Sequence, residues 1–556
     1  MEPKRIFEIG VGDDGRNSGL STPARPGTPS SVPTSRPSTP TGRRPFHYYG
    51  TVGRPPSSLE AGTLEPSRVS DASISEQNVY MRYKYYSRLR QRADSSEAAL
   101  LIPDHVVPSS FFIPLLPLPD LAGRQSSVVT IFAIWNTMMG TSLLSMPWAI
   151  QRAGVILGSG LLLLMFMVCL YTAYRTVNAQ SNAGITGDVL ELPQLMRLLL
   201  GRWAECATLL ASILALVGAS IAYWILLTNF LYSMVKFIEN EIEMANKSPD
   251  FYNYTVANVI CPSKNISDEL ILGNSSFDEF WSLNLTAPLV LFLLLFPLMN
   301  VKSPSFFMKF NAMGTISVFF IAVFIGVKVG EWGFHVNIHD DTRDDYVALY
   351  SLSSAHVLTG VLSLAMFTHN VIITIMSNQR HPENNGRDLS AAYVLVTITY
   401  CSVGLLFWLA FPLAKDCIED NLLNNFSGND VLAAVARCFL LFQLTTVFPL
   451  LTYVIRSQIM YVIYETVYPG FWHVLFLNLL IAILCVLFTI FLPQIGTIIR
   501  FAGAFCGMVL VFTLPCVAYM AVLRRQGKLS FPIQVFHGLL IAGGLLNLAL
   551  QFVGGD

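Results

Sequence analysis

The segment from Trp135 to Ser142 places polar and small residues, WNTMMGTS, directly after the apolar run VVTIFAI. Gly140 lowers the helix propensity there, and Thr and Ser hydroxyls can bond backbone carbonyls that a break in the helix would free. Pro147 removes a further backbone donor. We therefore predict a discontinuous helix, whose exposed backbone dipoles would bind the carboxylate of an amino acid and a cation. The alternative is a helix-packing face, which Gly, Ser and Thr also provide.

Two further polar groups interrupt apolar segments. Thr445 and Thr446 lie just before Pro449, and such paired hydroxyls suit a sodium site because a dehydrated Na⁺ needs several oxygen ligands. Alternatively, each hydroxyl bonds the backbone of its own helix, as Thr commonly does in transmembrane helices. The second group centres on His369. Its functional role would be that of a proton carrier or a substrate contact, and the alternative is a histidine held by a packing hydrogen bond, which we favour.

The sequence lacks the common signatures of enzymes. It contains no nucleophile elbow, no paired carboxylates within an apolar segment and no phosphate-binding glycine loop. We therefore expect no enzymatic activity, no organic cofactor and no nucleic-acid partner. The polar groups instead predict a protein that moves or senses a small solute, with sodium as a candidate coupling ion.

These groups lie in a chain with the composition of an integral membrane protein. Only 13% of its 556 residues are charged and 53% are hydrophobic, whereas soluble proteins carry about 25% charged residues. Apolar runs of about 20 residues follow one another, the length at which a helix crosses the hydrocarbon core. The runs are continuously apolar rather than alternating, so we predict an all-α fold and not a barrel of strands. The eleven predicted transmembrane helices are Val128-Ile150, Val155-Arg175, Cys206-Phe237, Leu285-Asn300, Asn311-Trp332, Val357-Met376, Ala391-Phe411, Val431-Tyr453, Phe471-Leu492, Ile495-Val522 and Pro532-Phe552.

Loop charge predicts which side of the membrane each loop faces. Arg and Lys concentrate in the even-numbered loops and Asp and Glu in the odd-numbered ones, which places the N-terminus in the cytosol. Glycosylation sequons, N-x-[ST], agree, because all of them fall in the third loop, residues 238–284, or in the seventh. The candidate glycosylation sites on that non-cytosolic side are Asn246, Asn253, Asn265, Asn274, Asn284 and Asn425.

Cysteine positions support the same orientation. Of the nine cysteines, Cys261 and Cys417 alone lie in loops, and the alternation of spans puts both loops in the oxidising compartment. We therefore predict a disulfide between Cys261 and Cys417 that joins the third and seventh loops. No His or Cys stands beside either one at metal-ligand spacing, so we expect no metal site beyond sodium.

Residues 1–119 form a tail of different composition. Its middle reads STPARPGTPSSVPTSRPSTPTGRR, which cannot bury enough apolar surface to fold, so we predict a largely disordered cytosolic tail. The segment Met81-Arg92 mixes aromatic and basic residues without an acid, and on its own it favours anionic lipid head groups as the partner. No apolar run opens the chain, so we expect no cleaved signal peptide.

The segment IWNTMMGTS resembles the first helix of the sodium-coupled neutral amino acid transporters, part of the amino acid/polyamine/auxin permease superfamily. KSPSFF, ENN, KDCIE and FQLTTV extend the resemblance along the chain. The tail segments YYSRL and PDHVVP resemble the lysosomal, arginine-sensing branch of that family. The resemblance covers about residues 80–556.

The resemblance implies a fold and a set of binding residues. The domain over residues 120–556 would have eleven helices, the first ten forming two inverted five-helix repeats of the leucine-transporter type. Membrane lipids, cholesterol among them, would surround it. The disulfide between Cys261 and Cys417 is implied here as well. Arginine would bind at Thr137, Met138, Met139, Gly140, Thr141 and Ser142, and sodium coupling would use Asn136, Thr445 and Thr446.

The resemblance also implies a role for the tail. Through its segment 80–108 it would bind the Ragulator complex and Rag GTPases at the lysosomal surface and promote activation of mTOR complex one. The same tail would plug the cytosolic cavity, although residues 109–121 depart from the family's juxtamembrane pattern. Short sorting patterns, EAALLI and YSRL, agree with a lysosomal location. The docking positions would be Tyr83, where the family has an aliphatic residue, with Tyr86, Leu89, Pro103 and Pro108.

Three functions stay open. The first is an arginine-sensing lysosomal transporter that exports leucine and other large neutral amino acids in an arginine-stimulated way and signals through Ragulator and Rag GTPases. The second is a plain sodium- or proton-coupled amino acid symporter without a signalling role. The third is an arginine receptor without significant transport. The tail residues favour the first.

Overall fold

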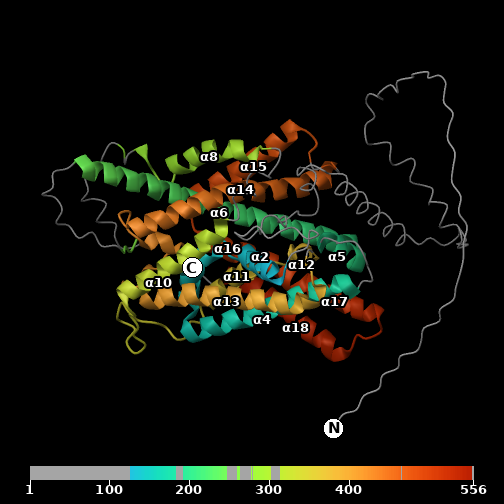
Figure 1. Ribbon diagram of the computed structural model, residues 1–556. Helices are drawn as coiled ribbons and strands as arrows, with labels where there is room; N and C mark the ends of the chain where they lie inside the picture. The colour runs from blue at the N-terminus through green and yellow to red at the C-terminus, as the bar shows by residue number, and fades with distance from the viewer. Residues whose placement is uncertain are drawn as a thin grey trace, which may run out of the picture. The chain divides into compact units, whose positions relative to one another are not determined.

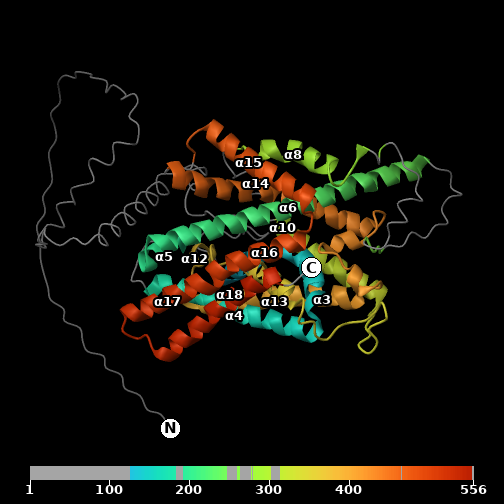
Figure 2. The ribbon, with the colours of Figure 1, turned by 180° about the vertical axis from the view of Figure 1, so that it is seen from behind.

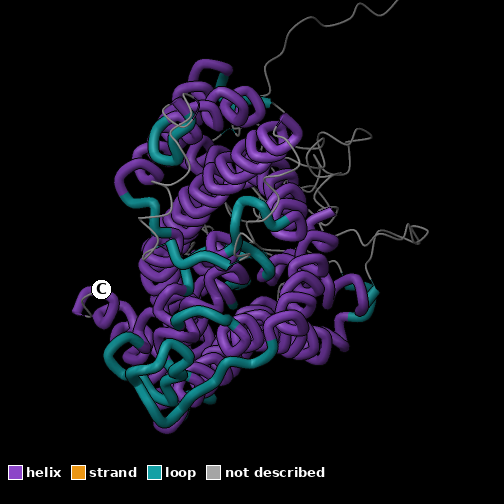
Figure 3. The backbone as a smooth tube through the Cα atoms, turned by 90° about the vertical axis from the view of Figure 1, so that its left-hand side faces the viewer, coloured by secondary structure: helices purple, strands orange, loops and turns teal. Residues whose placement is uncertain are grey.

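The computed structural model describes residues 126–182, 192–246, 259–262, 277, 280–301, 313–377, 379–464, 466 and 468–553. The regular structure of these residues is helical (Figure 3), and extended backbone pairs there in isolated bridges, Val259–Phe426 and Asn337–Tyr346. The all-α fold is therefore confirmed for the described part of the chain. The predicted docking residues Tyr83, Tyr86, Leu89, Pro103 and Pro108 lie outside it.

Each predicted span coincides with one helix or with one interrupted helix (Figure 1). A further short amphipathic helix, α5 (Leu192–Leu200), lies between the second and third spans. The spans, in chain order, are α2 (Ser127–Met138) with α3 (Ser142–Ala153), α4 (Val155–Asn182), α6 (Arg202–Asn246), α8 (Thr286–Met299), α10 (Met313–Trp332), α11 (Ala355–Ala365) with α12 (Ile372–Ser377), α13 (Asn385–Ala410), α14 (Val431–Tyr464), α15 (Phe471–Phe491), α16 (Ile495–Gly507) with the π-helix η8 (Met508–Thr513) and α17 (Leu514–Arg525), and α18 (Phe531–Val553).

Length and composition mark these helices as those of a multi-pass membrane protein. In the described ranges, eight helices are long and apolar enough to cross a membrane singly, and α2 with α3 makes a ninth although the two are bent by 63°. The helices α8 and α11 are shorter but apolar, and the span predicted at α8 is likewise short. Eleven crossings stay the prediction for the whole chain.

The outer surface of the bundle also fits a bilayer. In α18 the buried residues are polar or small, His537, Gly544, Asn547 and Gln551, whereas apolar side chains point outward. Phe552, for example, is 73% exposed. An apolar surface of this kind is unfavourable in water but is solvated by the hydrocarbon tails of lipids. The polar face of α18 therefore packs against neighbouring helices.

The helices of the predicted site lie inside the bundle. Figures 1 and 2 show α6 running beside α14, and the rings of Trp224 and Phe448 meet edge to face between them, with centroids 5.2 Å apart. Helix α11 packs along α16 and against α3. A Cβ on Gly503 of α16 would collide with the carbonyl oxygen of Gly360 in α11. Small residues therefore let the backbones of α11 and α16 touch, a common packing device in membranes.

Contacts between loops sort the helix ends into two groups. At one end, called the disulfide end below, Cys261 and Cys417 are bonded to each other. At the other, called the α2-start end, the Arg387 guanidinium at the start of α13 donates to the Ser127 hydroxyl at 3.3 Å. The third and seventh loops thus lie at the same end, as the alternation of spans predicts.

The interruptions fall in corresponding places. The first span breaks between α2 and α3, and the sixth breaks between α11 and α12. The two breaks are five spans apart, which is the spacing expected of two five-helix repeats of the leucine-transporter type. The first break is predicted from the sequence, and the second is not.

Candidate functional site

The first interruption is a tight turn at Met139. Helix α2 ends at Met138, and the amide of Gly140 donates to the Met138 carbonyl at 2.9 Å, with Met139 at φ −76° and ψ 73°. These values are those of an inverse γ-turn. The amide of Met139 still donates to the carbonyl of Trp135 at 3.0 Å, and α3 begins at Ser142. The predicted discontinuous helix is therefore confirmed.

The residues predicted to bind arginine form or flank this turn: Thr137, Met138, Met139, Gly140, Thr141 and Ser142. Thr141 is only 7% exposed, and the hydroxyl of Thr137 donates to the Ala133 carbonyl at 2.8 Å. A Cβ on Gly140 would lie 3.4 Å from the hydroxyl of Tyr223 in α6. The turn therefore lies in the interior of the bundle, next to a tyrosine that the sequence analysis does not single out.

The turn brings two helix ends of opposite polarity together. The C-terminal end of α2 presents carbonyl groups and partial negative charge, and the N-terminal end of α3 presents amides and partial positive charge. Thr141 precedes α3 without a side-chain hydrogen bond to its first amides. An amino acid has an ammonium and a carboxylate group in close proximity, so this pair of helix ends matches its charges.

The second interruption is held by α13. Helix α11 ends at Ala365 and α12 begins at Ile372. Between them Thr368 is fully buried, with its hydroxyl 3.0 Å from that of Tyr393 in α13. The Tyr393 hydroxyl also donates to the Met366 carbonyl at 3.1 Å. This break therefore depends on a side chain from another helix.

His369 lies in the same break and has a packing partner. It is fully buried, and its Nε2 lies 2.8 Å from the hydroxyl oxygen of Thr172 in α4. The Thr172 hydroxyl proton points to the Val168 carbonyl at 2.9 Å, so we assign the imidazole proton to Nε2, which donates to Thr172. This is the packing role that the sequence favours.

A tyrosine absent from the sequence predictions joins both interruptions. Tyr400 of α13 is fully buried, and its hydroxyl donates to the carbonyl of Met138 and to that of Ala365, the latter at 3.1 Å. These two carbonyls belong to the last residues of α2 and α11. Tyr393 and Tyr400 lie on one face of α13, two turns apart. Because a buried tyrosine hydroxyl needs a partner, this spacing within an apolar span is the sequence signal that could have identified them.

The predicted sodium residues lie on α2 and α14, and α10 connects the two. Asn136 Oδ1 accepts a hydrogen bond from the hydroxyl of Thr315, near the start of α10, at 3.5 Å. At the adjacent position, a Cβ on Gly314 would come within 2.8 Å of the amide nitrogen of Gln443 in α14. The Thr446 hydroxyl donates to the Gln443 carbonyl at 2.7 Å. Its lone pairs stay available to a cation even though its proton bonds the backbone.

Gln443 of α14 adds a side-chain oxygen that the sequence analysis does not single out. The side-chain Oε1 of Gln443 is buried without a hydrogen-bond partner among the described residues. Within those residues, no hydrogen bond joins Asn136 directly to Thr446 or to the half-buried Thr445. The donor set of amide and hydroxyl oxygens suits a sodium ion, which is a hard, oxygen-binding cation.

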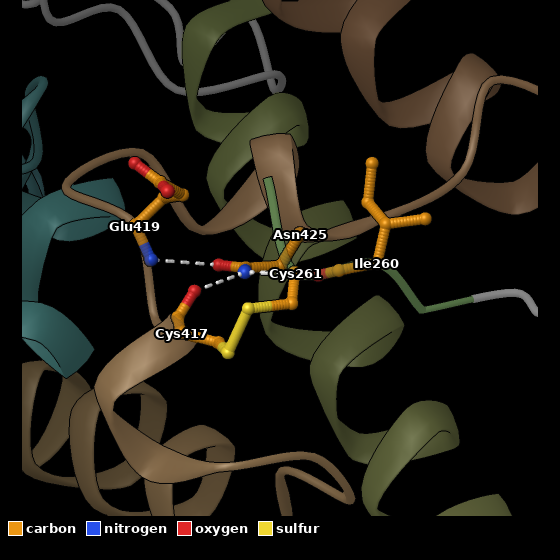
Figure 4. The surroundings of a disulfide bond; sticks show 5 residues. All are labelled: Ile260, Cys261, Cys417, Glu419 and Asn425. Carbon is orange, nitrogen blue, oxygen red and sulfur yellow. Dashed lines mark hydrogen bonds between the residues drawn. A yellow bond between two sulfur atoms is a disulfide. The ribbon is translucent and has the colours of Figure 1, made fainter. Parts of the chain in front are cut away.

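The predicted disulfide between Cys261 and Cys417 is present, with Cα atoms 5.1 Å apart. Figure 4 shows that Asn425 lies between the two segments. Its Nδ2 donates to the Cys417 carbonyl at 2.7 Å and to the Ile260 carbonyl at 3.3 Å, and its Oδ1 accepts from the Glu419 amide at 2.9 Å. The asparagine therefore repeats, without a covalent bond, the link that the disulfide makes.

The structure disfavours a glycan on Asn425. The side chain is fully buried, and the nitrogen that would carry the glycan donates to two carbonyls. Asn284, by contrast, is exposed just before α8. The side chains of the other candidates, Asn246, Asn253, Asn265 and Asn274, lie outside the described residues.

At the disulfide end, Asp420 connects the seventh loop to the start of α16. Its Oδ2 accepts from the amide of Gly496 at 2.8 Å. Burial raises the pKa of the Asp420 carboxyl, while hydrogen bonds from the amides of Gly496, Ile495 and Asn421 oppose that rise. The ring of Trp148 in α3 packs on Gly496 so closely that a Cβ would collide with it. Helix α3, which follows the turn at Met139, therefore packs on the residue whose amide Asp420 binds.

Comparison with known proteins gives consistent matches. Residues 123–547 match the family described as transmembrane amino acid transporter protein. The chain is 41% identical over 537 residues to neutral amino acid transporter 9 of Danio rerio, covering 92% of this chain and 95% of that protein. It is 38% identical over 577 residues to the sodium-coupled neutral amino acid transporter 9 homolog of Caenorhabditis elegans, covering 99% and 91%. Among solved structures, a manganese transporter of Eremococcus coleocola aligns with a TM-score of 0.42 and 14% identity over 80% of this chain and 89% of the other, a similarity too distant to support an inference.

Proposed function

This chain belongs to the family of transmembrane amino acid transporter proteins, and we propose that it is a lysosomal transporter that senses arginine. In this role it exports leucine and other large neutral amino acids in an arginine-stimulated way. It reports amino acid sufficiency through Ragulator and Rag GTPases to mTOR complex one. Amino acid transport by a multi-pass membrane protein follows from the family; the substrate, the location and the signalling are our proposal.

The observation that carries the proposal is the turn at Met139. It places the C-terminal end of α2 beside the N-terminal end of α3 in the interior of the bundle. A bound arginine would direct its carboxylate to the amides that begin α3 and its ammonium to the carbonyls that end α2. Thr141, at the start of α3, is the position that the resemblance ties to arginine recognition.

Sodium coupling is supported by the oxygens around α10. Asn136 comes from α2, and Thr446 and Gln443 come from α14, where Thr445 adjoins Thr446. Gln443 Oε1 has no hydrogen-bond partner in the part of the chain that the structure describes. A sodium ion held there would join the first interrupted span to the eighth span. Binding of the ion would then favour the arrangement in which the substrate turn is formed, which is the thermodynamic basis of coupling.

The location and the tail complete the proposal. The disulfide, the exposed Asn284 sequon and the acidic loops share one side of the predicted topology, as expected of the lysosomal lumen. The tail would then face the cytosol, where Tyr83, Tyr86, Leu89, Pro103 and Pro108 can dock on Ragulator and Rag GTPases. Luminal arginine would favour a conformation that expels the tail from the cytosolic cavity and leaves it free to dock.

The transport part is tested with purified protein in proteoliposomes. Uptake of tritiated arginine and tritiated leucine is measured separately, with sodium or choline as the main cation. Thr141→Trp should abolish arginine binding and uptake, because the indole fills the space beside the turn. Leu164→Trp is the matched control, since it adds the same ring to a side chain that is 56% exposed on the outside of α4.

The outcomes separate the three functions. Uptake by the wild type that Thr141→Trp abolishes and Leu164→Trp retains would support transport through this site. Arginine binding without uptake would identify a receptor. Normal arginine binding by Thr141→Trp would refute the site. Loss of sodium dependence in Thr446→Val, with uptake retained, would support the sodium residues.

The signalling part is tested in cells. Full-length protein is captured and its partners are identified, with Tyr86→Ala as the docking variant and Tyr48→Ala as a tail control. Recovery of Ragulator and Rag subunits by the wild type and by Tyr48→Ala, but not by Tyr86→Ala, would support the proposal. Recovery of sorting adaptors alone would leave a plain symporter.

A further inference from the structure

The hydroxyl group of Tyr400 in α13 forms hydrogen bonds to both interruptions. It donates to the Met138 carbonyl at the end of α2 and, at 3.1 Å, to the Ala365 carbonyl at the end of α11. We propose that Tyr400 is a positioning residue that holds the two interrupted spans at the separation that the substrate site requires. The consequence for substrate affinity rests on the proposed transport function.

Neither carbonyl has a hydrogen-bond donor within its own helix. The last carbonyls of α2 and α11 have no amide one turn further on, because the helices stop there. Tyr400 is fully buried, so water is not an alternative donor. Removing the hydroxyl would take one hydrogen bond from each carbonyl and leave the Met138 carbonyl with the Gly140 amide as its donor. In an apolar interior the interruptions would have to rearrange to replace the lost bonds.

The bond to Met138 also acts on the substrate turn. The Met138 carbonyl accepts from the Gly140 amide in the γ-turn as well as from Tyr400, and the amide of Met139 donates to Trp135. The peptide plane between Met138 and Met139 is therefore fixed on both sides. Because Met138 and Met139 are among the residues predicted to bind arginine, the hydroxyl of Tyr400 fixes the orientation of this part of the site from outside the interrupted helix.

Because the hydroxyl has one proton, it can share a hydrogen bond between both carbonyls only while the two helix ends lie close together. If α2 and α11 moved apart, the bond would go to one carbonyl and the other would lose its donor. The tyrosine thus stabilises one relative position of the two interrupted spans. Tyr393, on the same face of α13, differs because its hydroxyl contacts the second interruption alone, at Met366 and Thr368.

This difference supplies a matched control. Tyr400→Phe and Tyr393→Phe each remove one buried hydroxyl from α13 and keep the ring. We expect Tyr400→Phe to raise the KM for tritiated arginine or leucine about tenfold, equivalent to about 1.4 kcal/mol, with the maximal rate changed less than about twofold. Tyr393→Phe should leave KM within about twofold of the wild type, while both variants lose comparable thermal stability.

A second measurement does not depend on transport. Hydrogen exchange followed by mass spectrometry is measured on the full chain in detergent, for peptides that cover each interruption. Tyr400→Phe should speed exchange around Met139 and around Met366, whereas Tyr393→Phe should speed it around Met366 alone. Unchanged exchange around Met139 in Tyr400→Phe would overturn the bridging role.

The two readouts also distinguish this inference from the proposed function. If the wild type transports neither amino acid, the proposed function fails, and the exchange pattern still decides whether Tyr400 joins the interruptions. If the wild type transports and both variants raise KM equally, the hydroxyl acts through general stability and the positioning role is refuted. A KM shift in Tyr400→Phe alone, with faster exchange at both interruptions, supports it.

Discussion

Gly154 joins α3 to α4 with φ 85° and ψ 166°, a conformation that is essentially restricted to glycine. The loop before α11 crosses this junction, where the amides of Val155 and Ile156 donate to the carbonyls of Ala348 and Leu349 at 3.0 and 3.1 Å. A Cβ on Gly154 would lie 2.9 Å from both of these carbonyl oxygens. We therefore predict that Gly154→Ala destabilises the protein.

The size of the effect has two parts. A non-glycine residue in this region of φ and ψ costs about 1–3 kcal/mol. Relief of the close contact requires the loop to move away from α4, and each of the two backbone hydrogen bonds lost costs about 0.5–1.5 kcal/mol. Together they lower the free energy of unfolding by about 2–6 kcal/mol. In soluble domains each kcal/mol of lost stability lowers the melting temperature by about 2–4 °C. On that scale the melting temperature of Gly154→Ala should fall by roughly 5 °C or more.

The assay is fluorescence-detected size-exclusion chromatography of detergent-solubilised protein after heating. Gly160→Ala is the control on the same helix, because a Cβ there meets no atom within 4 Å. It should be neutral or stabilising by about 0.5–1 kcal/mol, since alanine favours helix. The reasoning from backbone conformation and loop contact is refuted if Gly154→Ala has the melting temperature of the wild type. It is also refuted if the melting temperature of Gly160→Ala falls as far as that of Gly154→Ala.

Three further predictions concern the disulfide end. Ser427→Ala removes the sequon but keeps Asn425, so the glycosylated mass on a gel should not change; a downward shift would show that Asn425 carries a glycan. Cys417→Ser removes the disulfide, whose cysteines are separated by 156 in sequence, and should lower the free energy of unfolding by about 2–4 kcal/mol. The melting temperature of the variant should fall, and reducing agent should lower that of the wild type in the same way. Asp420→Asn keeps an oxygen acceptor for the Gly496 amide but cannot titrate. As pH falls from about 7 to about 4, the wild type should therefore gain stability relative to this variant, and parallel melting curves would contradict the raised pKa.

The sequence predicts the first interruption because its cause is local. Gly140 and the hydroxyls around it weaken the helix where they stand, and the γ-turn forms at the adjacent Met139. The second interruption has no glycine or proline between Ala365 and Ile372. It is held by Tyr393 and Tyr400, which follow later in the chain and reach it only through the fold. The spacing of the two tyrosines marks them as buried side chains that need partners, but a single sequence does not show which carbonyls they reach.

Burial and packing explain the other differences between the sequence predictions and the structure. The sequon at Asn425 is a correct pattern in a loop on the predicted side, but the fold uses the asparagine to join two loops. Lys328 lies within an apolar span, and its partner Asp430, 2.8 Å away, precedes α14. The pairing depends on how α10 packs against α14, not on spacing along the chain. Alternation of spans, by contrast, is a property of the whole chain, and it correctly predicts that Cys261 and Cys417 meet.

The titratable groups at the disulfide end agree with an acidic compartment. Burial raises the pKa of Asp420, so the folded state binds its proton more readily than the unfolded state. The stability from this group is therefore present at acid pH and is lost as pH rises from about 3.9 through the raised pKa. Burial lowers the pKa of Lys415 to about 8, so its contribution changes only between about pH 8 and 10.4 and is constant in acid. The hydroxyl of Thr342 lowers the pKa of Asp340, and that opposing effect acts only below about pH 3.9. Burial, together with the neighbouring Asp420, also raises the pKa of Glu419. In mild acid the effects of Asp420 and Glu419 vary together, and both favour the folded protein.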